Sequence, residues 1–377
     1  MSHIYGGRGV TVASGAGCRL RDADGREYVD FVAAQGGALF GHAHPDLVAA
    51  LREAAGDPWT IGLGLDSPVR DAFLDRLRTL RSGGKAFLCN SGTEAIEAAL
   101  KLATALRPGK KRILAARRGF HGRTLGALSL TFNPQYRKAW LHLLPPVEHF
   151  APEELAANVD GSVAAVFVEP VQGEGGVYPM SPTVAASLNE ACGACGAILV
   201  ADEVQSGWGR CGGLLASTIV GLEPDIVALA KGVAGGLPAG AIVWRGDLGD
   251  FPAKGHGTTY GGNPLVAAVG CAAWDALNAH RYPQKAAALG TFFRAALSEI
   301  RSPLVKDIRG LGLLVGVEVS VKAPDIVKRL QEKGVLALPA GPSVVRFLPP
   351  FVAGEDDCLF VRDALALVLE AFGDAGD

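Results

Sequence analysis

Three features are missing from this chain, and each absence excludes a class of protein. The first is a charge excess: 36 Lys and Arg stand against 38 Asp and Glu, which gives a formal net charge of −2. Charge-driven binding to nucleic acid or to an acidic membrane needs a strong basic excess, so we expect neither kind of partner. The second is the apolar core of a signal peptide, which residues 1–8 lack. The third is an unbroken membrane span, because Lys231, glycine and proline interrupt the most apolar stretch, 226–244. The sequence therefore predicts a soluble cytoplasmic protein.

Common metal-binding and nicotinamide-binding patterns are also missing. The seven cysteines are scattered, and the CxxC of Cys192 and Cys195 has no second cysteine pair or histidine cluster to complete a zinc site. We expect ordinary buried or helix-face thiols there, and no metal. No predicted strand is followed by GxGxxG, which disfavours a nicotinamide enzyme.

Glycine is abundant, with 50 of the 377 residues, but it follows no G-X-Y period, so a collagen is excluded. Glycines spread through an apolar chain indicate many tight loops that approach a ligand closely. Short apolar runs alternate with amphipathic stretches from about residue 86 onward, which is typical of a buried, mostly parallel sheet with helices. The apolar runs are 86–89, 112–116, 163–168, 197–201, 225–230 and 239–244.

The two ends of the chain have a different texture. Residues 11–31 predict a small β meander, followed by a helix capped by Asp46. Residues 265–300 predict a long helical stretch, and strands at 311–319 and 344–348 precede a C-terminal helix. We therefore predict an α/β protein in three segments: residues 1–45 belong to a small α+β domain, 46–265 form the large domain, and 266–377 complete the small domain.

Charged residues close three of the apolar runs. Glu169 follows 163–168, Asp202 follows 197–201, and Lys231 follows 226–230. Ligands of parallel α/β sheets bind outside the carboxyl ends of the strands, so Asp202 and Lys231 should meet at one sheet edge. The alternative is a structural Asp–Lys ion pair.

A second polar group opens a predicted helix at 95–106. Ser91, Gly92 and Thr93 follow the run 86–89, and free N–H groups at a helix N-terminus suit a phosphate. The alternative is ordinary helix capping.

Together, a phosphate site, an acid and a lysine meet the needs of pyridoxal 5′-phosphate (PLP). This cofactor requires a phosphate anchor, a carboxylate that keeps the pyridine nitrogen protonated, and an amine that forms the Schiff base.

Six segments in order give the chain a resemblance to class III aminotransferases of the acetylornithine/ornithine type, which have PLP fold type I. They are NSGTEA (90–95), GFHGRT (119–124), EPVQGEGG (169–176), DEVQSGWGR (202–210), ALAKG (228–232) and HGTTYGGNP (256–264). The resemblance covers nearly the whole chain. It implies a large domain with a mostly parallel seven-stranded sheet, and a small α+β domain built from both chain ends.

The resemblance also implies residue roles in cofactor binding. Ser91, Gly92 and Thr93 would bind the phosphate, Phe120 would stack on the pyridine, and Gln205 would lie by the phenolic oxygen. Asp202 would be the pyridinium partner and Lys231 the Schiff-base lysine. Thr259 resembles the hydroxyl that reaches the phosphate in the partner subunit, which implies a homodimer with shared active sites.

Substrate roles follow in the same way. Arg123 resembles the arginine that clamps the substrate α-carboxylate, a bidentate task suited to a guanidinium. Glu174 and Arg346 resemble a switch pair, in which Glu174 neutralises Arg346 until 2-oxoglutarate brings a second carboxylate. Thr258 joins the expected substrate-binding set. The alternative for Arg346 is a purely structural ion pair.

The expected reaction moves the terminal amino group of a blocked ornithine or lysine to 2-oxoglutarate, in arginine or lysine biosynthesis. Residues 118–131 and 339–350 resemble acetylornithine aminotransferases, and still more the enzymes whose substrate is held on an acidic amino-group carrier protein. Two departures stand out: Ile96 replaces the family's usual Asn, and the segment 56–66 is short and lacks an aromatic pair. Three alternatives remain, namely an aminomutase, an ω-amino acid transaminase of the 4-aminobutyrate or free-ornithine type, and a PLP-free binding protein.

Overall fold

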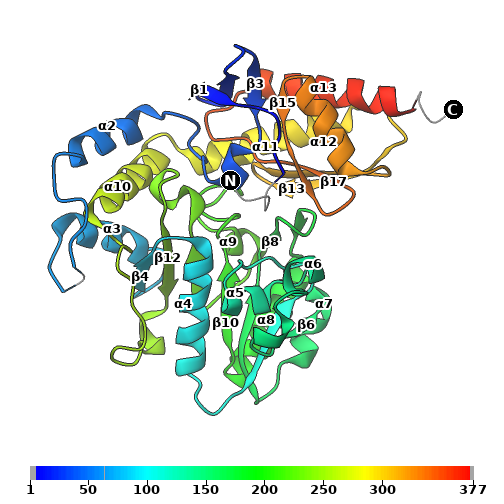
Figure 1. Ribbon diagram of the computed structural model, residues 1–377. Helices are drawn as coiled ribbons and strands as arrows, with labels where there is room; N and C mark the ends of the chain where they lie inside the picture. The colour runs from blue at the N-terminus through cyan, green and yellow to red at the C-terminus, as the bar shows by residue number, and fades with distance from the viewer. Residues whose placement is uncertain (1–5, 63, 374–377) are drawn as a thin grey trace.

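The computed structural model describes residues 6–62 and 64–373, and a seven-stranded sheet lies at the centre of its larger part (Figure 1). The strand order is β4-β12-β11-β10-β7-β5-β6, and only β12 runs antiparallel to its neighbours. The mostly parallel seven-stranded sheet predicted from the sequence is confirmed. Its strands are β4 (Lys85–Cys89), β5 (Arg112–Ala116), β6 (Glu148–Phe150), β7 (Val163–Val168), β10 (Ile198–Asp202), β11 (Ile226–Leu229) and β12 (Gly240–Trp244).

The six apolar runs noted in the sequence all form strands of this sheet. β6 was missed, because it is a three-residue edge strand that pairs with β5 alone. An edge strand with one neighbour needs no continuous apolar run, so its sequence, EHF, carries no strand signal.

Helices cover the sheet on both faces. Helix α4 packs through buried Ile96, Ala99 and Leu102 against sheet residues such as Phe167 and Val200. The helices of this part are α2 (Pro45–Ala54), α3 (Pro68–Arg78), α4 (Gly92–Ala105), α5 (Leu125–Leu130), α6 (Pro134–Arg137), α7 (Pro152–Leu155), α8 (Pro182–Cys195), α9 (Ala216–Val220) and α10 (Pro264–Ala279), with short 3₁₀ turns η1 (Leu141–Leu143), η2 (Ala156–Asn158), η3 (Lys231–Ala234) and η4 (Gly246–Leu248).

Helix α2 begins two residues earlier than the sequence predicted. Pro45 occupies the first helical position and His44 is the N-cap, so Asp46 lies in the first turn and is not the cap. Proline suits this position because its fixed φ matches the helix and its missing N–H would have no partner there.

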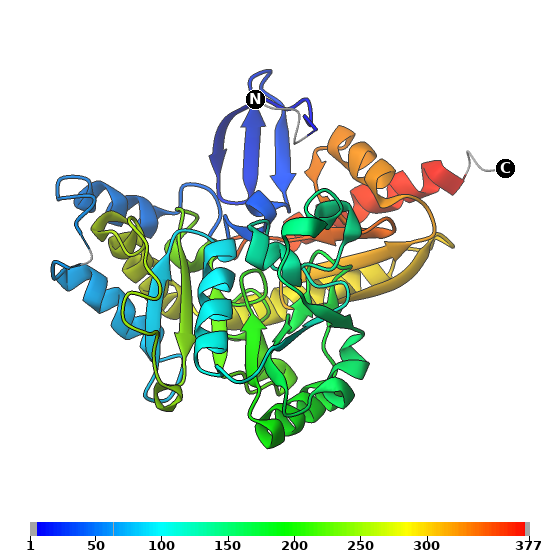
Figure 2. The ribbon, with the colours of Figure 1, turned by 60° about the horizontal axis from the view of Figure 1, so that its bottom comes forward.

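The two chain ends form one structure. Strand β15 pairs in parallel with β3, which joins residues 335–336 to the N-terminal meander. Figure 1 and Figure 2 both place the blue N-terminal strands at the same end of the molecule as the orange and red C-terminal segments. One apolar cluster unites Val29 and Phe31 with Phe293, Val317 and Leu365. The elements are β1 (Val12–Ala16), β2 (Arg19–Asp22), β3 (Glu27–Asp30), α1 (Ala33–Gly36), α11 (Tyr282–Ser298), β13 (Val305–Leu311), β14 (Leu314–Val319), α12 (Ala323–Glu332), β15 (Val335–Leu336), β16 (Leu338–Ala340), β17 (Val344–Phe347) and α13 (Glu355–Gly373).

Two C-terminal predictions were too simple. The helical stretch 265–300 is two helices, α10 and α11, separated by Arg281 at φ +54°. The strand expected at 311–319 is the second half of a hairpin, which turns at Gly312 with φ +50°.

The domain boundaries at 45/46 and 265/266 stay predictions. The second boundary falls inside α10, whose buried residues pack with the core around β11 and β12.

No helix in the described part of the chain is long and apolar enough to cross a bilayer. All seven cysteines are free thiols, and Cys192 and Cys195 both lie on α8.

Candidate active site

Asp202 and Lys231 lie at the same edge of the sheet, as their positions in the sequence predicted. Asp202 is the last residue of β10 and pairs in register with Ala228 on β11, three residues before Lys231. Asp202 is buried, and Lys231 begins the turn η3 with φ +50°. A non-glycine residue with such a φ is strained, and strain of this kind concentrates at functional sites.

His121 is the direct partner of Asp202. Its Nδ1 lies 2.8 Å from Asp202 Oδ2, and the N–H of Val204 donates to Oδ1 at 3.0 Å. Burial lowers the pKa of His121, but the hydrogen bond and the charge of Asp202 outweigh burial, so that the pKa of His121 is raised. The sequence reasoning missed His121, although it lies inside the segment GFHGRT. No ion pair joins Asp202 to Lys231 in residues 6–62 and 64–373, so the simple Asp–Lys alternative is not what forms.

Lys231 carries an amine that no described side chain or backbone group pairs with. Burial lowers its pKa to about 8, against the opposing effect of the nearby Asp202 charge. A substantial share of the amine is therefore neutral near physiological pH, which is the nucleophilic form. A Cβ added at Gly36 would lie 3.6 Å from Lys231 Cδ, so the chain approaches this lysine closely.

The turn around Gly36 is a second strained segment beside the lysine. Ala33, Ala34 and Gln35 all have positive φ, at 44°, 51° and 54°. Gln205 Nε2 donates to the Gln35 carbonyl at 3.0 Å, which ties this turn to the segment after β10. The left-handed conformation of these residues is strained, so the contacts around the turn must offset its cost in free energy.

The N-terminus of α4 opens beside the same edge. Ser91 Oγ accepts from the N–H of Glu94 at 3.3 Å, so Ser91 is the N-cap. A Cβ at Gly92 would come within 2.6 Å of Val204 Cγ1, so only glycine fits there. Thr93 Oγ1 contacts Thr124 Oγ1 at 2.9 Å and accepts from the N–H of Arg123 at 3.3 Å. The helix end is thus joined to the loop that carries His121, and its amides favour an anion.

Glu174 and Arg346 form an ion pair close to Gln205. Arg346 Nη2 donates to Glu174 Oε2 at 2.9 Å and its Nη1 donates to Gln205 Oε1 at 3.1 Å. Arg346 is 2% exposed, and its buried Nε has no partner in the described residues. Tyr136 donates to Glu174 Oε1 at 3.2 Å, and its pKa is raised by burial and by the Glu174 charge.

Arg123 is exposed and lies over aromatic rings. Its guanidinium carbon is 3.5 Å from the ring centre of Tyr136 and 5.6 Å from that of Phe120. The backbone N–H of Phe120 donates to Glu169 Oε1 at 2.8 Å, and Gly173 N–H donates to Oε2 at 3.3 Å. Burial raises the pKa of Glu169 to about 7. Glu169 was noted only as a charged strand end, yet it links the Phe120 loop to the hairpin that carries Glu174.

The two threonines of the 256–264 segment differ in environment. Thr258 Oγ1 accepts from Asn90 Nδ2 at 3.2 Å and from Gly261 N–H at 3.1 Å, next to Ser91. Thr259 is exposed, and its side chain makes no hydrogen bond within the part of the chain that the structure describes. Its predicted role toward a partner subunit stays a prediction.

Comparison with known proteins agrees with this geometry. The family model described as "Aminotransferase class-III" matches residues 5–369. The chain belongs to the class III aminotransferases. A [LysW]-aminoadipate semialdehyde transaminase of Deinococcus radiodurans is 40% identical, over 98% of this chain and 88% of that one. An acetylornithine aminotransferase of Gloeobacter violaceus is 36% identical, over 98% and 95% of the two chains.

A solved structure shares the fold. The ornithine aminotransferase from Toxoplasma gondii, described with partial occupancy of PLP at its active site, has a TM-score of 0.93 and 31% identity, over 99% of this chain and 92% of that one. This aminotransferase is therefore a PLP-dependent enzyme of fold type I, as the sequence predicted.

The residues at the sheet edge fit PLP. An amine without a partner is available for covalent attachment, a carboxylate is held by His121 and the backbone, and Gly92 lets the N-terminus of α4 approach Val204 more closely than a Cβ would allow. When bound, PLP supplies an electron sink for the carbon that bears the substrate amine.

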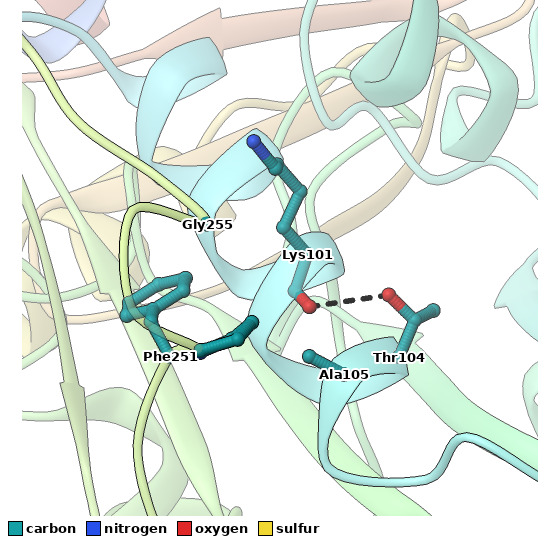
Figure 3. Close-up of a pocket in the computed structure, with 6 residues that line it drawn as sticks. Lys101, Thr104, Ala105, Phe251 and Gly255 are labelled. Atoms are coloured by element: carbon teal, nitrogen blue, oxygen red, sulfur yellow. Dashed lines mark hydrogen bonds between the residues drawn. The ribbon is translucent and has the colours of Figure 1, made fainter.

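A separate cavity of about 290 Å³ lies between α4 and the loop that follows η4 (Figure 3). Lys101, Thr104 and Ala105 line it on the side of α4, and Phe251, Pro252 and Gly255 line it on the side of the loop. Lys101 and Thr104 lie in the half of α4 away from Ser91, and no site residue lines the cavity, so it forms no part of the candidate active site.

Proposed function

We propose that this aminotransferase moves the terminal amino group of a blocked ornithine or lysine to 2-oxoglutarate, giving the semialdehyde and glutamate. The names of its relatives support this substrate class: one acts on a LysW-linked aminoadipate semialdehyde and another on acetylornithine. The observation that carries the proposal is the Glu174–Arg346 pair beside Gln205, because it lets one pocket accept substrates of different charge.

The switch rests on the charge of the substrate side arm. A blocked donor brings no carboxylate to Arg346, and Glu174 then neutralises the buried guanidinium. When 2-oxoglutarate or glutamate brings a second carboxylate, it replaces Glu174 in a charge-assisted bond to Arg346. Glu174 is about one-third exposed, on the hairpin between β8 (Val171–Gln172) and β9 (Tyr178–Pro179), so it is free to swing aside.

At the end remote from its reacting carbon each substrate carries a carboxylate, which is the α-carboxylate of the donor and the C5 carboxylate of 2-oxoglutarate, and we assign its recognition to Arg123. The guanidinium lies over Tyr136 and is exposed, so it can reach an incoming acid without losing the support of the ring. Thr258, held by Asn90 beside the N-terminus of α4, completes the proposed substrate-binding set.

Cofactor binding is assigned to the residues at the sheet edge. Ser91, Gly92 and Thr93 would hold the phosphate, Phe120 would stack on the ring, Gln205 would lie by its phenolic oxygen, and Asp202 would keep the ring nitrogen protonated. Lys231 would attach the cofactor, and its amine would move a proton at the substrate carbon that bears the departing amine. An amine whose pKa is near 8 suits both tasks near neutral pH.

A carrier protein and a second subunit are the proposed partners. The LysW-linked names of relatives point to an acidic amino-group carrier as the blocking group, and exposed Arg117, Arg118 and Arg123 offer it positive charge beside the Glu174 hairpin. Exposed Thr259 is proposed to act in the active site of the other subunit of a homodimer.

A panel of donors, each with 2-oxoglutarate, tests the substrate. We expect N-acetylornithine or carrier-protein-linked lysine to give a far higher kcat/KM than free ornithine or 4-aminobutyrate. Glutamate formation is the readout, and the Lys231→Ala variant supplies the background. Free ornithine is the second candidate, because the Toxoplasma gondii neighbour is an ornithine aminotransferase. A clear preference for free ornithine or 4-aminobutyrate would contradict the blocked-donor proposal.

A further inference from the structure

Three potential metal ligands converge at a point unrelated to the cofactor residues. His44 and Asp46 stand at the start of α2, and His280 follows the end of α10, which packs beside α2. One ligand atom from each of the three lies within 4.8 Å of the others. Within residues 6–62 and 64–373 this is the one such cluster of histidine, cysteine or carboxylate groups.

His44 is buried, and its hydrogen bonding is incomplete. Its side chain is held in place, with Nε2 2.8 Å from the hydroxyl of Tyr282. The residue is 7% exposed, and its buried Nδ1 has no hydrogen-bond partner in the described part of the chain. A buried polar atom left without a partner is costly, and a bound ion or water is a usual partner for such an atom.

The other two groups are adjustable. His280 Nε2 lies 2.8 Å from Asp46 Oδ2, and both side chains are nearly half exposed. The rings of His44 and His280 are 5.8 Å apart between centres. A zinc ion with bonds of about 2 Å needs its ligand atoms about 3.3 Å apart, so a movement of about an ångström by the two exposed side chains would suffice.

We propose that His44, Asp46 and His280 bind a divalent transition-metal ion, for which Zn²⁺ is the best match. Two imidazoles and one carboxylate suit zinc, whereas Mg²⁺ and Ca²⁺ prefer sets made of oxygen atoms alone. Water fills the remaining position on the exposed side. The ion joins the first turn of α2 to the junction of α10 and α11, and it takes no part in transamination.

Tyr282 supports the site from behind. When the proton of His44 is on Nε2, this N–H donates a hydrogen bond to the hydroxyl of Tyr282, and the Nδ1 lone pair stays available for the metal. This arrangement is common for metal-bound histidines. Tyr282 is 5% exposed and stacks on Phe351 with ring centres 4.8 Å apart, so its hydroxyl is fixed.

The test is Zn²⁺ titration of the tag-free, PLP-loaded enzyme in a calorimeter, with competition by a chelator of known affinity. We expect one ion per chain. His280→Ala and Asp46→Ala should each weaken the binding by at least about tenfold, and Tyr282→Phe, which keeps the stacking ring, should weaken it to a similar extent. The matched control is His142→Ala, which removes an exposed histidine outside the cluster and should bind Zn²⁺ as the wild type does.

Further readouts separate this site from other metal ligands. Both exposed variants should keep wild-type transamination, because neither residue contacts the cofactor residues. Co²⁺ in place of Zn²⁺ should give a spectrum of nitrogen and oxygen ligation, whereas thiolate charge-transfer bands would place the metal on cysteine and overturn the proposal. Equal Zn²⁺ affinity in wild type and His280→Ala, or no saturable binding in the wild type, would overturn it too.

Discussion

The surroundings of Lys231 disfavour its charged, protonated form, so the reactivity of its amine depends on pH. Burial lowers its pKa to about 8, although the carboxylate of Asp202 acts in the opposite direction. Asp202 is itself held by His121, so it does not neutralise Lys231 by a direct ion pair. Two predictions follow from this arrangement of single residues.

The loading of PLP onto the enzyme stripped of cofactor should rise with pH. The neutral amine is the reactive form, so the rate should increase about tenfold per pH unit below pH 8 and level off above it. Stopped-flow absorbance gives the rate, and borohydride reduction with peptide mapping should label Lys231. Lys254→Ala, which changes an exposed lysine, is the control. A rate that is flat between pH 6 and about 8.5, or a label on another lysine, would contradict the assignment.

Asp202→Asn should lower kcat by at least about 100-fold while PLP stays covalently attached. An amide cannot hold the ring nitrogen protonated, and it also deprives His121 of its charged partner. The control is Asp225→Asn, which changes a partly buried carboxylate that accepts from the Leu199 N–H away from the cofactor residues. Steady-state kinetics and the visible spectrum are the measurements. If Asp202→Asn retained near-normal kcat, Asp202 would be structural only.

Among the secondary-structure elements, the β8–β9 hairpin is the one that the proposed function ties most directly to substrate choice. It carries Glu174 toward Arg346 on β17, and the ring of Tyr178 on β9 lies between two arginines. The guanidinium carbon of Arg118 lies 4.2 Å from the ring centre, and that of Arg309 on β13 lies 3.9 Å from it. Arg309 Nε also donates to the Gly176 carbonyl at 2.9 Å. The hairpin thus contacts both Arg118, which follows β5 of the large sheet, and Arg309 on the C-terminal strand β13.

Glu174→Ala should affect the two half-reactions unequally. Arg346 would face the donor side arm without neutralisation, so the donor half-reaction should slow by more than about tenfold, while glutamate becomes a better donor than in the wild type. Glu174→Gln keeps the size of the side chain and should show the same direction. Stopped-flow measurement of each half-reaction is the test. Equal slowing of both halves would mean that Glu174 only holds the pocket together.

Tyr178→Leu should reproduce part of this effect without touching the ion pair. Removing the ring releases Arg118 and Arg309, and contacts of this kind contribute about 0.5–1 kcal/mol each, so the donor half-reaction should slow about two- to fivefold. Tyr178→Phe keeps the ring and should behave as the wild type does. The same slowing in Tyr178→Phe would assign the effect to the hydroxyl and not to the stacking.

At the scale of the whole molecule, the open question is how two chains would share a site. Thr259 is exposed and unbonded within the described chain, whereas the neighbouring Thr258 is held by Asn90. If the exposed hydroxyl of Thr259 contacts a cofactor, we expect that cofactor to be bound by a second subunit that covers this surface.

Mixed dimers test this sharing directly. The Lys231→Ala homodimer should be inactive, and the Thr259→Val homodimer should have reduced activity. A heterodimer of the two should contain one intact site if Thr259 acts in the other subunit, and so should show about half of the wild-type activity per dimer, with a normal KM. If Thr259 acts within its own chain, the heterodimer would keep one weakened site and show about half of the activity of the Thr259→Val homodimer per dimer. Differently tagged chains allow the heterodimer to be purified.

Much of this protein is determined by local sequence. Six central strands were predicted because a strand buried on both faces must be apolar along its whole length, and that pattern is visible without any tertiary contact. The positions of Asp202 and Lys231 followed in turn, because neighbouring parallel strands end at the same edge. Ser91 and Gly92 were found for a similar reason, since a helix N-terminus after a strand is a local signal.

Tertiary structure alone decided which side chains pair. His121 meets Asp202, and Arg346 meets both Glu174 and Gln205, across chain separations that no periodicity records. The edge strand β6 and the break between α10 and α11 also escaped prediction, because an edge strand or a helix end takes its stability from neighbours in space. The cluster of His44, Asp46 and His280 belongs to the same class: it exists only because α2 packs beside α10. Strand and helix patterns act over a few residues, whereas the pairing of charged groups depends on how the finished elements pack.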